Sequence, residues 1–92
     1  MIKSFCCQET KRLFETGKTR RWNGVNKVAQ RKLTMLHTAR ELQDLASPPG
    51  NRLEALKGNR LGQHSIRINS QWRICFRWTS AGPEDVEIVD YH

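Results

Sequence analysis

One stretch of the sequence decides the fold: Gln71-Trp72-Arg73-Ile74-Cys75-Phe76-Arg77-Trp78. Large apolar side chains occupy every second position of it. Successive side chains of a β-strand point to opposite faces, so the four large apolar residues share one face, and Arg73 and Arg77 share the other. The stretch therefore predicts a strand with an aromatic side toward a core and a cationic side away from it.

Three further segments in the C-terminal half predict strands around this one. Residues 64–69 repeat the alternation, and residues 52–57 and 86–91 are short segments bounded by turn residues. The turns fall at residues 58–62 and 80–83, both of which contain glycine. Strands joined by such short turns form an antiparallel meander.

The N-terminal half predicts two helices. Residues 7–16 form a short one that Gly17 ends, because glycine readily takes the left-handed conformation of a helix C-terminus. Apolar residues then recur at three- and four-residue steps over residues 25–45, which predicts a longer amphipathic helix with Asn23 as its cap. Two prolines after this segment prevent the helix from continuing.

With a short strand over residues 1–5, the predicted order is strand, helix, helix and four strands. We expect an α+β fold in which two N-terminal helices pack on one face of a small antiparallel β-sheet. The length of 92 residues suits a single domain, residues 1–92.

The composition points to an anionic partner. The 16 Lys+Arg outnumber the 9 Asp+Glu for a net charge of +7, which favours nucleic acid or another polyanion. Three cysteines without C-x-x-C spacing make a poor disulfide framework and a poor zinc site, so we expect neither metal nor another cofactor. The chain has no apolar run long enough for a bilayer and no signal-peptide pattern, so we expect a cytoplasmic protein with no membrane partner.

The polar face of the predicted sheet is the candidate binding surface. Arg67, Arg73 and Arg77 share this face, with Lys57 and Arg60 near its rim. A guanidinium fork matches two phosphate oxygens at once, so the arrangement favours RNA or DNA. The plainer interpretation is a solvated outer face.

Catalysis requires more than cations. Metal-free RNA cleavage needs a base for the 2′-hydroxyl, cations for the phosphorane and an acid for the 5′-oxygen. Lys57 and Arg73 are candidate cations, and the terminal Asp90-Tyr91-His92 supplies candidate proton-transfer groups. The alternative is a polar terminus without a role, and we expect His37 and His64 to pack rather than catalyse.

The connector between the predicted helices is a candidate protein-binding surface. Its residues Arg20, Arg21 and Trp22 would expose a tryptophan among charges, which is typical of an interface anchor.

Several motifs together resemble a known family. They are Met1-Ile2-Lys3-Ser4-Phe5, Leu56-Lys57-Gly58, the stretch from Gly62 to Trp72-Arg73, and the terminal Asp90-Tyr91-His92. In this order and spacing they resemble the HigB branch of the RelE/ParE toxin superfamily, over essentially the whole chain. Residues 18–22 and 47–56 extend the resemblance to the GraT-like HigB toxins.

The resemblance implies a RelE-like, microbial-ribonuclease-like fold and the toxin of a type II toxin–antitoxin pair. Such a toxin is a ribosome-dependent endoribonuclease that cuts mRNA in the ribosomal A site. The implied partners are a HigA-type helix-turn-helix antitoxin, the ribosome and mRNA, with operator DNA reached only through the antitoxin.

The resemblance also implies roles for individual residues. Lys57 matches a basic residue near the scissile phosphate, and Arg73 matches an arginine that stabilises the phosphorane. Asp90, Tyr91 and His92 match the terminal group needed for toxicity. The expected RNA-binding residues are Arg60, Arg67, Gln71 and Arg77, and the candidate antitoxin-binding residues are Arg20, Arg21 and Trp22.

Two departures from the family pattern keep other functions open. Glu54 stands where some HigB toxins have a histidine, and Gln71 stands where some have an asparagine. A carboxylate at position 54 would either act as a base or repel phosphate. The alternatives are a growth inhibitor that cuts no RNA, such as a ParE-like poison of DNA gyrase, and an inactive RNA- or ribosome-binding module.

Overall fold

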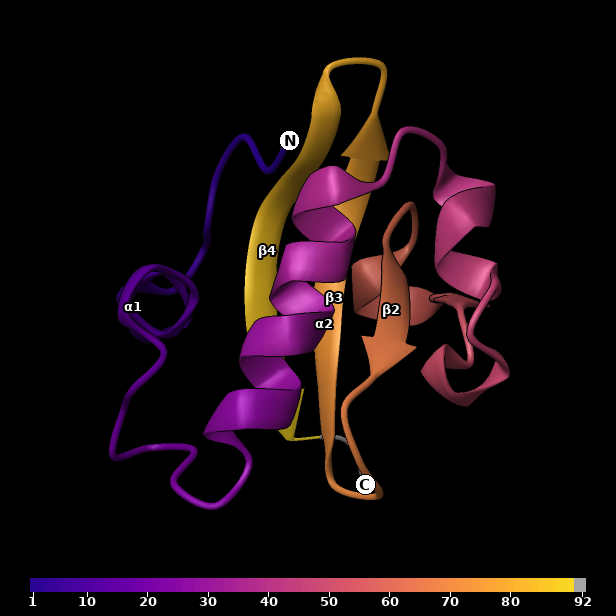
Figure 1. The fold of residues 1–92 in the computed structure, drawn as a ribbon. Coiled ribbons are helices and arrows are strands. Elements are labelled where there is room, and N and C mark those ends of the chain that lie inside the picture. The colour runs from indigo at the N-terminus through magenta and orange to yellow at the C-terminus, as the bar shows by residue number, and fades with distance from the viewer. Residues whose placement is uncertain (91–92) are drawn as a thin grey trace.

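The computed structural model describes residues 1–90, in which two α-helices accompany a four-stranded sheet. The sheet is antiparallel in the order β1-β2-β3-β4, so each strand pairs with its neighbour in sequence. Figure 1 shows α2 lying along one face of the sheet and α1 beside the β4 edge. The predicted α+β fold is confirmed.

The elements are α1 (Gln8–Thr16), α2 (Asn26–Thr38), the 3₁₀ segments η1 (Leu42–Ala46) and η2 (Pro49–Asn51), β1 (Glu54–Ala55), the 3₁₀ segment η3 (Gly58–Arg60), β2 (His64–Arg67), β3 (Trp72–Thr79) and β4 (Gly82–Asp90).

The core lies between α2 and the sheet. Ile74 and Phe76 of β3 are fully buried and cluster with Leu33 and Leu36 of α2, as the alternation in the sequence predicts. Burying side chains of this size is the main favourable term in folding. The other buried members of the cluster are Leu13, Trp22, Ala29, Leu45, Ile66, Ile68, Val86 and Ile88.

The outer edge of β4 is covered by the N-terminal segment and α1. The strand predicted over residues 1–5 is reduced to a single parallel bridge between Phe5 and Val86, next to which the Cys6 backbone N–H donates to the Val86 carbonyl over 3.0 Å. Further along, the Ile88 backbone N–H donates to Thr10 Oγ1 of α1 over 3.1 Å. These bonds satisfy backbone N–H and C=O groups at the edge of β4, which would otherwise be open to pairing with another chain.

The second helix is shorter than the predicted 25–45. α2 ends at Thr38, and the chain then turns because the Asp44 carboxylate binds the backbone N–H groups of Arg40 and Glu41 over 2.9 and 3.0 Å. That capping begins the separate 3₁₀ segment η1. A local side-chain bond to the backbone thus overrides the helical periodicity.

The connector before α2 also differs from the sequence-based expectation. Val25, not Asn23, is the N-cap of α2, and the Asn23 backbone N–H instead donates to the Arg20 carbonyl over 3.3 Å. Trp22 is only 1% exposed, and its ring packs edge-on against Trp72 with centroids 6.3 Å apart. The expectation of an exposed Trp22 is therefore wrong, because the core takes up its ring.

The flanking strands differ from their predicted bounds. β1 is shorter than residues 52–57, and β4 begins at Gly82 rather than at residue 86. A register shift opposite Phe76 places an extra residue in β4, with Asp85 in the left-handed region at φ 54°. A bulge of this kind increases the local twist of a strand.

Candidate active site on the outer sheet face

The sheet face that points away from α2, the outer face, carries polar side chains in register. Glu54 of β1, Ser65 of β2, Cys75 of β3 and Glu87 of β4 are successive partners across the sheet. Directly opposed residues of antiparallel strands point to the same side, so these four side chains form one row. Two carboxylates therefore stand among the arginines of a face that the sequence predicts to be cationic.

Arg73 belongs to this face and is held firmly in it. Its side chain is buried, at 8% exposure, with Nε donating to Ser65 Oγ over 2.7 Å and Nη2 donating to the Arg52 carbonyl over 2.7 Å. A buried charge requires such partners to offset its lost hydration. The bonds fix the plane of the guanidinium, so the plainer interpretation of a solvated outer face is wrong at this position.

The Arg52 carbonyl owes its position to the turn before it. Arg52 takes a left-handed conformation at φ 45° and ψ 56°, which is unfavourable for a residue with a side chain. Asn51 locks the turn, because it is fully buried, donates to the Leu45 carbonyl over 3.0 Å and accepts a hydrogen bond from Lys32 Nζ. The turn thereby directs the Arg52 carbonyl at the guanidinium of Arg73.

The predicted cations Lys57 and Arg60 lie at the β1 side of the outer face. Lys57 is exposed and, with Arg60 and Glu54, lines an open pocket of about 540 Å³. Arg60 reaches across to β4, where Nη1 forms an ion pair with Glu87 Oε1 at 2.8 Å. The hydrogen bond to Glu87 raises the pKa of the Arg60 guanidinium above its already high value.

The Cys75 thiol lies at the middle of this charged surface and is fully buried. Burial raises the pKa of the thiol, with Arg60 opposing the rise and Glu87 adding to it. The thiol therefore stays protonated at neutral pH and makes a poor nucleophile.

The remaining predicted residues occupy the two ends of the sheet. At one end, Gln71 Nε2 donates to Asp90 Oδ2 over 3.2 Å, and both residues are exposed. At the other end, Arg77 lies over Gly62, where a Cβ would come within 2.8 Å of its Nη1, and forms an ion pair with Asp85 at 3.8 Å. Arg67 is half-buried and directly opposite Arg73. The predicted Tyr91 and His92 lie outside the described residues.

Sequence reasoning missed three contributors to the site. Ser65 and the Arg52 carbonyl bind Arg73, and Glu87 pairs with Arg60. The alternation over residues 64–69 already put Ser65 on the polar side, but the pairing of Ser65 with Cys75 follows only from strand register.

The two histidines of the described chain pack against rings, as the sequence predicts. The His37 ring lies 5.1 Å from that of Phe14, and its Nδ1 accepts a hydrogen bond from the Ile2 backbone N–H over 3.2 Å. The His64 ring stacks on Phe76 with centroids 6.3 Å apart. Within residues 1–90 we find no group of His, Cys, Asp and Glu that could hold a metal ion, and no helix long and apolar enough to cross a bilayer.

Comparison with known proteins places the chain in a family. Residues 3–92 match the model of the HigB-like toxins, described as the RelE-like toxin HigB of type II toxin–antitoxin systems. The chain is 35% identical over 94 residues to Endoribonuclease HigB of Proteus vulgaris, with the whole of both chains covered.

Two other relatives match over a shorter stretch. Toxin HigB-1 of Vibrio cholerae is 52% identical over 48 residues, and an uncharacterized protein of Haemophilus influenzae is 40% identical over 52 residues. These matches cover 52% and 56% of the chain and span about half the length of each relative, 50% and 52%. The family model, in contrast, covers nearly the whole chain. The chain therefore belongs to the HigB-like family of RelE-like toxins of type II toxin–antitoxin systems.

Proposed function

We propose that the chain is a toxin that inhibits growth as an endoribonuclease, cutting mRNA in the A site of the translating ribosome. The observation that carries the proposal is the buried Arg73 guanidinium, fixed by Ser65 and the Arg52 carbonyl on the outer face. The name of the Proteus vulgaris relative, Endoribonuclease HigB, supports the same activity.

The proposed reaction needs no metal ion. The 2′-oxygen of a ribose attacks the adjacent phosphorus, its proton passes to a base on the protein, and the bond from phosphorus to the 5′-oxygen breaks. The departing oxygen takes up a proton, which leaves a 2′,3′-cyclic phosphate and a 5′-hydroxyl. Arg73 and Lys57 are the cations that stabilise the crowded phosphorane, since preorganised positive groups act where the negative charge develops.

The proton-transfer groups come from the chain terminus and the β1 side. Asp90, Tyr91 and His92 are our candidates for the acid and the base, with Glu54 as a further candidate base. A rim of Arg60, Arg67, Gln71 and Arg77 would contact the phosphates and bases on either side of the cut.

The proposed partners follow from the family. A HigA-type helix-turn-helix antitoxin would neutralise the toxin in the cytoplasm. The toxin would reach operator DNA only through this antitoxin. The buried Trp22 removes the reason for placing the antitoxin surface at an exposed tryptophan, and leaves Arg20 and Arg21 as exposed candidates in that connector.

Primer extension on mRNA from cells that express the chain tests the proposal. We expect new 5′ ends in register with the codons in cells that express wild-type protein, and none with Arg73→Ala or with His92 deleted. Arg31→Ala, on the exposed side of α2, is the matched control that should keep them. DNA breaks without new RNA ends would instead indicate a gyrase poison, and growth inhibition without either would indicate a binding module.

A further inference from the structure

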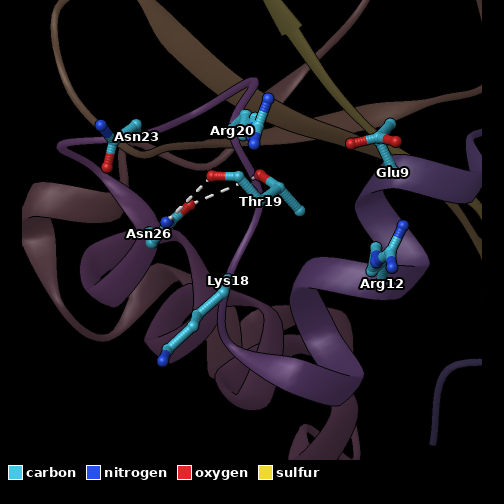
Figure 2. A pocket seen from close by; sticks show the side chains of 7 residues that line it. All are labelled: Glu9, Arg12, Lys18, Thr19, Arg20, Asn23 and Asn26. Atoms are coloured by element: carbon cyan, nitrogen blue, oxygen red, sulfur yellow. Dashed lines mark hydrogen bonds between the residues drawn. The ribbon is translucent and has the colours of Figure 1, made fainter.

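A second cationic pocket lies between α1, the connector over residues 17–25 and the start of α2, none of which contributes to the outer face (Figure 2). In Figure 2, Glu9 and Arg12 of α1 stand on one side, Asn23 and Asn26 on the other, and Lys18, Thr19 and Arg20 between them. The pocket has a volume of about 690 Å³. Each of these seven lining side chains is charged or polar.

The pocket is built before any ligand arrives. Asn26 Nδ2 donates to the Thr19 carbonyl over 3.1 Å, and the Lys18 backbone N–H donates to Thr16 Oγ1 over 3.2 Å. Trp22, buried in the core, anchors the far end of the connector. These contacts fix the backbone that carries the cations, so binding need not order the connector itself.

Cations outnumber carboxylates among the residues that line the pocket. Arg12, Lys18 and Arg20 line the pocket with a single carboxylate, that of Glu9. The ion pairs found within residues 1–90 join Arg60 to Glu87 and Arg77 to Asp85, so none of them uses a cation of this pocket. Like charges that line one pocket repel one another, and a bound anion relieves that repulsion.

We propose that this pocket binds backbone phosphates of RNA at a second point, away from the outer face. Guanidinium forks, an ammonium group and amide donors are the groups that contact phosphate and sugar in nucleic-acid complexes. A protein partner would instead require an apolar or aromatic anchor at its centre, and none lines the pocket. The proposal rests on the proposed function only for the choice of RNA as the polyanion.

The test compares two double variants of the full chain that lose the same charge. Arg12→Ala with Arg20→Ala removes two of the three cations that line the pocket, and Lys27→Ala with Arg31→Ala removes two exposed cations of α2 that do not line it. The probe is a fluorescent 2′-O-methyl RNA hairpin, which lacks the attacking hydroxyl and is not cut. Its affinity is measured by anisotropy over a range of salt concentrations.

We expect the pocket variant to bind the hairpin on the order of tenfold more weakly than the control variant at about 0.1 M salt, with a salt slope smaller by about one to two. Equal weakening of both variants would overturn the proposal, because the effect would then follow net charge alone. Unchanged RNA affinity with weakened antitoxin binding would overturn it in favour of an acidic protein partner.

Folding and cleavage are followed separately. Thermal unfolding checks both variants, and Arg12→Gln with Arg20→Gln repeats the test if the alanine pair unfolds early. If wild-type protein cuts no RNA while the hairpin result holds, the proposed function fails alone. If RNA is cut while both variants bind the hairpin equally, the second site fails alone.

Discussion

Arg73 Nε of β3 lies 2.7 Å from Ser65 Oγ of the adjacent strand β2, and both residues are buried. The Arg52 carbonyl accepts a second bond from the same guanidinium, also over 2.7 Å. Together these contacts orient the cation before RNA arrives. A cation that is already oriented in the free protein stabilises a transition state without having to reorganise during the reaction.

Removing the Ser65 hydroxyl should therefore reduce both catalysis and stability. We expect Ser65→Ala to slow RNA cleavage by about 10- to 100-fold and to lower the free energy of unfolding by about 1 to 2 kcal/mol. Ser65→Thr keeps the hydroxyl and should recover most of the rate. Cleavage assays and urea unfolding measure the two effects, with the exposed Ser70→Ala as control. A wild-type cleavage rate in Ser65→Ala would show that this contact does not position Arg73.

The Asn51 side chain should contribute strongly to stability. Asn51→Ala leaves the buried Leu45 carbonyl without its donor and Lys32 without its acceptor, so the free energy of unfolding should fall by about 2 to 3 kcal/mol. The Arg52 carbonyl would shift with the turn, which should also slow cleavage. Urea unfolding of Asn51→Ala beside the exposed Asn59→Ala measures the difference. Matching midpoints for the two variants would contradict the role of the buried amide.

The Cys75 thiol should make stability fall at alkaline pH. Burial raises its pKa in the folded protein, so the folded state holds this proton more tightly than the unfolded state does. The resulting stability is complete below the pKa of the unfolded thiol and is lost as the pH rises through the folded pKa. Wild-type protein should lose unfolding free energy above pH ~9 more steeply than Cys75→Ala does.

The same substitution also tests whether the thiol takes part in the reaction. A protonated, buried thiol is no nucleophile, so Cys75→Ala should keep a cleavage rate on the order of wild type at neutral pH. A large loss of cleavage in a folded Cys75→Ala protein would give the thiol a direct role.

Trp22 should behave as a core residue and not as an interface anchor. We expect Trp22→Ala to lower the free energy of unfolding by about 3 to 5 kcal/mol, a large part of the stability of so small a domain. The matched control is Arg21→Ala, which loses only the cation–π contact 5.2 Å from the Trp22 ring and should cost about 1 kcal/mol or less. Thermal unfolding distinguishes the two variants, and similar small losses in both would contradict the buried placement.

The sequence predicts the sheet well because period-two alternation is a strong local signal. β3 lies within one residue of the alternating stretch at each end, and on its apolar side Ile74 and Phe76 are fully buried while Trp72 and Trp78 are partly buried. The bounds of α2 are less predictable, since the Asp44 bond to the Arg40 and Glu41 backbone competes with helical periodicity. The position of Trp22 depends on the ring of Trp72, fifty residues away, which no local pattern reveals.

The candidate site is predictable in its composition but not in its arrangement. The alternation brings Arg67 and Arg73 to one face, yet the sequence cannot show that Arg73 is buried, because its partners come from strand register and from the Arg52 turn. The pairing of Arg60 with Glu87 joins residues 27 positions apart and is equally invisible to a sequence pattern. Tertiary contacts of this kind decide which arginine is held by the fold.

The most direct test of the account is the rate of mRNA cleavage on purified translating ribosomes with Arg73→Ala and Arg73→Lys. We predict that both variants stay folded, as judged by urea unfolding, and that both lose at least about a hundredfold in rate. Alanine has no positive charge, and lysine lacks the planar guanidinium that can bind Ser65, the Arg52 carbonyl and a phosphate together. Folded Arg73→Ala protein that cuts the same sites at the wild-type rate would contradict the assignment of the active site.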